Sequence, residues 1–208
     1  MVIVFLSFSA YATAHADYLP LISLGTDPLG DVSPYKAYWD ILESYYTNDG
    51  TYLRFEMRCN AVPNPSDGDY HVYLDLKDGG DYSGGMKVLK GADYVFSCDG
   101  TLWKYSGGSW ISYPGLVSVQ IFSSNKTISF TCKLSDLGYP SECVHAIVKL
   151  STHSTVNAPP SASPKDQTDT YTLSCPVISE VPLIVLPPFL ALLVIVTYHK
   201  FKKYKTPT

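Results

Sequence analysis

The sequence predicts an all-β protein: an antiparallel β-sandwich of jelly-roll or immunoglobulin-like type, followed by one C-terminal transmembrane helix. Short apolar segments recur at roughly ten-residue spacing with turn signals between them, which is the pattern of a sandwich. Near the end of the chain, residues 181–198 contain no charged side chain. At about 1.5 Å per residue, such a run spans roughly the thickness of a bilayer core as a helix.

The first expected strands form a hairpin. Aromatic and aliphatic residues at 37–46 suggest one strand, and Asn48-Asp49-Gly50 is a strong hairpin turn signal. Residues 51–59 then alternate between two faces of a second strand. The apolar face carries Leu53, Phe55, Met57 and Cys59, and the polar face carries Tyr52, Arg54, Glu56 and Arg58. We expect one wall of a core here, with Glu56 in a surface ion pair.

The stretch 70–94 organises the domain. Val72, Leu74 and Leu76 alternate with polar or aromatic residues, which predicts a strand buried on one face only. Glycines at 79–85 then interrupt regular structure. A loop with its own chemistry therefore follows this strand.

Three carboxylates in that loop suggest a metal. Asp75, Asp78 and Asp81 are spaced by three residues among the glycines. Calcium takes six to eight oxygen ligands, some of them from the backbone of a flexible loop. The sequence therefore suggests a calcium site at these residues, and a solvated acidic turn is the alternative.

Short β segments continue to the end of the domain. They are expected at 92–98, 101–105, 117–122, 127–134, 144–151 and 170–173. Ser135-Asp136-Leu137-Gly138 is typical of a helical turn, with Ser135 as its cap. From 152 to 174 the composition shifts to Ser, Thr, Pro and Asn, so an extended stalk is an alternative for that part.

The two ends predict export and anchoring. Residues 1–16 join an apolar run to Ala14-His15-Ala16, a small-x-small cleavage pattern that predicts a signal peptide, with a buried strand as the alternative. The expected organisation is a signal peptide at 1–16, an extracellular sandwich domain at 17–174, a linker at 175–180, a transmembrane helix at 181–198 and a basic tail at 199–208.

Charge sets the expected orientation and excludes one class of partner. Four lysines follow the apolar run, so the positive-inside rule places the tail in the cytoplasm and the main domain outside the cell membrane. All 19 acidic residues and 11 of the 15 basic ones precede Val181, a net charge of −8. Phosphate binding needs a basic face, so nucleic acid is not an expected partner.

The five cysteines are compatible with disulfides in an exported protein. No CxxC or Cys/His spacing points to zinc. Cys132 with Cys143 and Cys59 with Cys98 are the candidate pairs, and Cys175 is left over. Asn125-Lys126-Thr127 is a glycosylation sequon, consistent with export.

Six segments resemble one family. They are DPLGD at 27–31, WDI at 39–41, YLRFEM at 52–57, YHVYLDLKDGG at 70–80, GADY at 91–94 and LSDLG at 134–138. Together they resemble the DOMON-like β-sandwich domains of prokaryotic surface proteins, near the family-9 carbohydrate-binding modules. The resemblance covers about residues 21–173. It implies a β-sandwich fold and carbohydrate as the leading ligand, with haem as the ligand of another branch.

The tail resembles a second pattern. ISEVP at 178–182, the apolar run and the lysines are similar to archaeal PEF-type sorting signals, although Ser179 and Val181 stand where proline and phenylalanine are expected. The resemblance implies an archaeal cell-surface protein anchored in the membrane. A sortase step that cleaves the tail is left open.

The residues favour binding over catalysis. The sequence contains no GxSxG, HExxH or phosphate-loop motif. Sugar binding needs aromatic faces and polar side chains, and Trp103, Tyr105 and Trp110 flank a glycine turn where an aromatic platform could form. The alternative is that one tryptophan fills the core and the others brace the hairpin. The function expected is therefore a non-catalytic cell-surface protein that binds a glycan or a cell-wall or S-layer component.

Three alternatives stay open. A structural or adhesive surface protein would need no small ligand. A glycoside-active enzyme would need paired carboxylates, for which Glu43, Glu56 and Glu142 are available. A haem-binding domain would need axial ligands facing one pocket, and Met57 and His71 are expected on opposite faces.

Overall fold

The structure, a computed structural model, describes residues 20–32, 36–138 and 145–174. All of these belong to the first of two units of the chain, Met1–Pro176. The expected signal peptide, linker, transmembrane helix and basic tail lie outside the described residues, as do Glu142, Cys143 and Cys175. Within the described ranges, no helix is both long and apolar enough to cross a membrane.

Two antiparallel sheets make up the domain, which confirms the all-β prediction. The first has five strands in the order β1-β2-β3-β9-β8. Their bounds are β1 Ile22–Thr26, β2 Ile41–Asn48, β3 Tyr52–Cys59, β8 Val117–Phe122 and β9 Thr127–Lys133. The second has seven strands in the order β11-β10-β4-β5-β6-β7, with β12 also paired to β10. Their bounds are β4 Asp69–Asp75, β5 Tyr94–Ser97, β6 Leu102–Ser106, β7 Ser109–Tyr113, β10 Ala146–His153, β11 Asp166–Gln167 and β12 Tyr171–Leu173.

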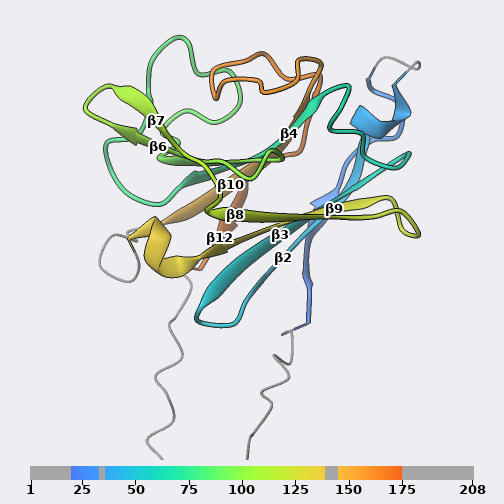
Figure 1. Cartoon of the computed structure of the whole chain (residues 1–208), viewed down its shortest axis with the longest axis horizontal. Coiled ribbons are helices and arrows are strands. Elements are labelled where there is room, and N and C mark those ends of the chain that lie inside the picture. Colours follow the sequence, from blue (N-terminus) through green and yellow to red (C-terminus); the bar gives the residue numbers. More distant parts are fainter. Residues whose placement is uncertain (1–19, 33–35, 139–144, 175–208) are drawn as a thin grey trace, which may run out of the picture. The chain divides into compact units, whose positions relative to one another are not determined.

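The two sheets face each other across a shared core. Figure 1 shows β4, β6 and β7 grouped above β2, β3 and β9. The apolar face of β3 is buried as predicted, and its Phe55 ring meets Phe96 of the opposite sheet at 6.1 Å between centroids. Burial of such aromatic rings contributes most of the energy of a core of this kind.

Strand β4 differs from its predicted form because both of its faces are buried. Tyr73 packs beneath the following loop, in a second small core with Met86, Val88, Leu89, Ala92 and Val95. Gly80 lies so close to Gly91 in this loop that a Cβ would stand 1.9 Å from the Gly91 carbonyl oxygen. The sequence pattern misses this cover because a strand's polar row can be buried when its side chains find partners.

The expected turns are largely confirmed. In the β2–β3 turn, Gly50 has a positive φ, and its amide donates to Asn48 Oδ1 at 2.8 Å. The first expected strand begins instead with a 3-10 turn, η1 Ala37–Trp39. A second one, η2 Leu134–Leu137, occupies the predicted helical turn, but it starts after Lys133 without a side-chain cap and ends at Gly138 in the left-handed region.

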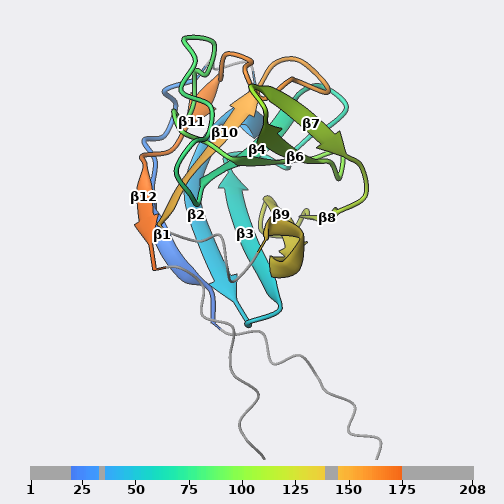
Figure 2. The same cartoon turned by 90° about the vertical axis from the view of Figure 1, so that its left-hand side faces the viewer.

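Three strands were not expected. β1, β7 and β11 are short, and each pairs with only one neighbour, at a sheet edge. Figure 2 shows β1 beside β2, and β11 and β12 beside β10. Short edge strands carry weak alternation signals, which explains why sequence patterns pass over them.

The expected Cys59–Cys98 disulfide is absent from the structure. Cys59, Cys98 and Cys132 are free thiols among the described cysteines. Cys59 is buried in the shared core, and the Cys98 thiol donates instead to Asp69 Oδ1 at 2.8 Å. Burial raises the pKa of Cys132 to about 12. Its expected partner, Cys143, lies outside the described residues.

Candidate functional site

The predicted aromatic platform lies on the β6–β7 hairpin. Tyr105 is paired across the strands with Trp110, and their rings lie 5.4 Å apart at 59°. Trp103 and Trp110 are half-buried against the small core beneath the loop after β4. Trp110 Nε1 also donates to Asp81 Oδ2 at 2.9 Å. The two tryptophans therefore brace the loop, and the tilt between the Tyr105 and Trp110 rings keeps them from forming one flat surface.

The three loop carboxylates are not brought together. Asp75 Oδ1 lies 2.6 Å from His145 Nε2, and Asp78 is exposed. Asp81 accepts from the Ser83 amide and from Trp110. Each buried carboxylate thus has its own partner, and the calcium site suggested for this loop stays a prediction.

A different acidic cluster does converge. Oxygens of Asp27, Asp31 and Asp166 all lie within 4.8 Å of one another, and no other such group of three ligand residues occurs in the described part of the chain. Asp166 accepts from the amides of Ile41 at 2.6 Å and Gln167 at 2.8 Å. Oδ2 of Asp27 is buried without a hydrogen-bond donor. These are the carboxylates that could hold a hard cation.

Crowding and burial change the acidity of this cluster. Burial, followed by the charges of Asp166 and Asp31, raises the pKa of Asp27 to about 7. Burial likewise raises the pKa of Asp166 to about 6. A proton or a cation is therefore needed to relieve the repulsion near neutral pH. The motif DPLGD at 27–31 contains Asp27 and Asp31, but no sequence signal predicts that the distant Asp166 lies beside them.

The outer face of the five-stranded sheet is polar. Arg54 pairs with Glu56 as expected, but Glu56 is buried and not at the surface, and Arg54 Nε donates to Ser129 Oγ at 2.9 Å. Arg58 pairs with Glu43 at 2.9 Å. Hydrogen bonds from Tyr45 and Arg58 lower the pKa of Glu43. Glu56 and Ser129 are buried, so the Arg58–Glu43 pair is the ion pair of this row that is more open to solvent.

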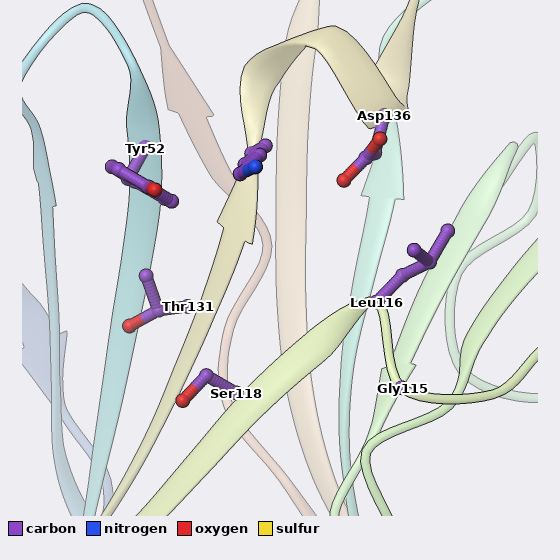
Figure 3. Close-up of a pocket in the computed structure, with 7 residues that line it drawn as sticks. Tyr52, Gly115, Leu116, Ser118, Thr131 and Asp136 are labelled. Atoms are coloured by element: carbon purple, nitrogen blue, oxygen red, sulfur yellow. The ribbon is translucent and has the colours of Figure 1, made fainter.

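A cavity of about 550 Å³ opens at one end of this face. Its lining residues are Tyr52, Gly115, Leu116, Ser118, Thr131, Lys133 and Asp136. Figure 3 shows Tyr52 on β3, Thr131 on β9 and Ser118 on β8 arranged side by side, with Asp136 on η2 above them. Neighbouring strands bring these residues together, since Tyr52 is paired with Lys133 and Thr131 with Ser118.

The cavity combines an exposed ring with unpaired charges. The Tyr52 side chain is 40% exposed. Over the described ranges, neither the Lys133 ammonium nor the Asp136 carboxylate makes an ion pair. Sequence reasoning assigned Tyr52 to a polar face but missed the cavity, because η2 and β8 reach it only in the folded chain.

A smaller cavity of about 280 Å³ also borders η2. Tyr105 from the predicted platform lines it, together with Tyr113 and Lys104. Lys104 Nζ donates to the Asp136 carbonyl at 2.5 Å and lies 5.0 Å from the centre of the Tyr113 ring. Its ammonium is thus already engaged.

The remaining predicted residues lie apart from these cavities. Asn125 is exposed in the β8–β9 turn, where its carbonyl accepts from Thr127 Oγ1 at 3.2 Å. Met57 lies in the shared core, whereas His71 lies on the outer face of β4. Met57 and His71 therefore do not face a common pocket.

Comparisons with known proteins add no relative. No protein-family model matches the chain, and no curated protein matches it. The resemblance to DOMON-like domains therefore rests on the motifs named above.

Proposed function

We propose that this chain is a non-catalytic cell-surface protein that binds carbohydrate. In this proposal the domain is a sandwich of jelly-roll or immunoglobulin-like type, held outside the cell by a transmembrane helix at 181–198. The motif resemblance, the charge-free run and the lysines after it support the topology. A glycan or a cell-wall or S-layer component is the partner.

The cavity beside the five-stranded sheet carries the ligand proposal. A pyranose ring has an apolar face that stacks on an aromatic ring and hydroxyls that need donors and acceptors. Tyr52 offers the exposed ring, while Ser118 and Thr131 offer hydroxyls beside it. Of the two cavities in the described part of the chain that an exposed tyrosine borders, this one is the larger, and its lysine and carboxylate make no ion pair.

The two unpaired charges suit a neutral sugar with neighbouring hydroxyls. Lys133 donates only, whereas the Asp136 carboxylate accepts only. One hydroxyl can therefore accept from Lys133 while another donates to Asp136. Hydrogen bonds to charged groups are worth about twice those between neutral groups, so this pair would fix the orientation of the ring.

The glutamates of the sheet face favour binding over hydrolysis. A glycosidase acid needs a raised pKa. Glu43 has a lowered pKa, from hydrogen bonds with Tyr45 and Arg58, and Glu56 is paired with Arg54. Neither is suited to donate a proton to a leaving group.

A thermal-shift series on the full chain in detergent tests the proposal. A ligand that binds only the folded form raises the unfolding midpoint. We expect one sugar of a monosaccharide and oligosaccharide panel to raise the midpoint of the wild type. The same sugar should raise the midpoint less for Lys133→Ala and Asp136→Asn, and by the full wild-type amount for the control Lys87→Ala. No shift with any sugar would favour a structural or adhesive surface protein instead. A loss with Tyr105→Ala alone would move the site to the β6–β7 hairpin.

A further inference from the structure

A segment between β10 and β11 covers part of the outer face of the second sheet, over β4 and β10. We call residues 154–165 the strap; in Figures 1 and 2 it is the orange loop near the top. The Ala158 amide donates to Asp69 Oδ2 at 2.8 Å. The Tyr73 hydroxyl donates to the Pro160 carbonyl at 3.0 Å. The strap is therefore held through polar groups beneath it.

These groups form a dry cluster on β4 and β10. Its members are Asp69, His71, Tyr73, Ser151 and His153, each at most 1% exposed. The two imidazole rings lie 4.6 Å apart, and the Asp69 carboxylate lies 3.2 Å from His71 Nε2. Because water cannot reach this cluster, each polar group depends on its neighbours and on the strap.

The contacts of His153 fit a neutral ring. Nδ1–H donates to the Ser163 carbonyl of the strap at 3.2 Å, and Nε2 accepts from the Ser151 hydroxyl at 2.8 Å. This tautomer is assigned from the hydrogen-bond network. A second proton would remove that acceptor and place a charge in a dry site beside His71. Burial, followed by the charge of His71, accordingly lowers the pKa of His153 to about 3.

Few charged groups near His153 could stabilise its protonated form. The titratable groups that face His153 from strand β4 are Asp69, His71 and the Tyr73 hydroxyl. The thiol of Cys98, after β5, donates a hydrogen bond to Asp69. Asp69 itself has a pKa lowered to about 2; burial would raise it, but the contact with His71 and the hydrogen bonds from Cys98 and the Tyr70 amide together outweigh that. The strap offers His153 only a backbone carbonyl, and Asp166 of β11 is engaged with Ile41. Asp69 is thus the one carboxylate beside the two rings in the described part of the chain.

We propose that the strap is an acid-triggered latch, released when His153 takes up a proton. Opening admits water to the ring, whose ordinary pKa is about 6.5. Below that pH, an opening that takes up one proton becomes about tenfold more populated for each pH unit. The opened form exposes the part of β4 and β10 that lies beneath the strap. In the extracellular setting of the proposed function, the latch would couple that surface to the acidity outside the cell.

Native-state hydrogen exchange on the full chain tests this proposal. After correction for the intrinsic rate, the protection of the Ala158 and Lys165 amides should fall about tenfold per pH unit from pH 6.5 to 4.5. It should also stay below that of the Phe55 amide in the core at every pH. His153→Gln should make the protection of these two strap amides much less dependent on pH.

Two results would overturn the latch. One is a pH-independent protection of the strap in the wild type, which needs no variant to be folded. The other is exchange of the strap amides only together with the Phe55 amide, because the strap would then open only by global unfolding.

Discussion

The indole nitrogen of Trp110 donates a hydrogen bond to Oδ2 of Asp81 at 2.9 Å. This contact joins two features that the sequence treats as separate sites, an aromatic platform and an acidic loop. Burial would raise the pKa of Asp81, but hydrogen bonds from Ser83 and Trp110 lower it below its ordinary value. The contact therefore ties the loop after β4 to the β6–β7 hairpin.

Trp110→Phe should destabilise the domain by about 1–3 kcal/mol, because it leaves a buried carboxylate without one of its donors. Tyr105→Phe is the matched control, since its hydroxyl makes no hydrogen bond within the part of the chain that is described, and its effect should be near zero. Denaturant unfolding of both variants measures this. Equal stability of the two would show that the Trp110–Asp81 contact contributes nothing.

Asp27→Asn should stabilise the domain at pH 8 in EDTA. The pKa of Asp27 is raised to about 7 in the folded protein, so folding favours its protonated form. That contribution is complete below about pH 4, the unfolded value, and is lost as pH rises to 7. Thermal midpoints from pH 4 to 8 should fall less steeply for the variant than for the wild type. If the midpoints of the wild type and of Asp27→Asn changed equally with pH, the pKa of Asp27 would not be raised by folding.

Calcium should act through the same carboxylate and not through the loop after β4. A cation bound by Asp27, Asp31 and Asp166 would raise the midpoint of the wild type and of Asp78→Asn, but not that of Asp27→Asn. The measurement is a thermal scan with calcium and with EDTA. If Asp78→Asn abolished a calcium shift, the ion would belong in the loop, as the sequence suggests.

Sequence patterns located the strands better than the sites. Alternation in residues 51–59 identified the buried face of β3 because side chains of a strand point to opposite sides. It could not reveal the cover over His71, which comes from the distant strap. The acidic cluster and the Tyr52 cavity also depend on residues distant in the sequence, because Asp166 lies near Asp27 after β1, and η2 and β8 line the same cavity. Such sites have no local sequence signal.

Cys59 and Cys98 should stay reduced. Cys59 is buried in the core, and Cys98 donates to Asp69. Alkylation in denaturant without a reductant, followed by peptide mass spectrometry, should modify both residues completely. A peptide pair linked through Cys59 and Cys98 would restore the disulfide that the sequence suggests.

Glycan binding at the Tyr52 cavity is the central claim, and a glycan panel probed with labelled full chain tests it most directly. The wild type and Tyr82→Ala, which removes an exposed ring elsewhere, should retain the same glycan. Tyr52→Ala should bind it about tenfold more weakly, because loss of one aromatic contact is worth about 1.4 kcal/mol. No retained glycan, or equal binding by Tyr52→Ala, would contradict this account.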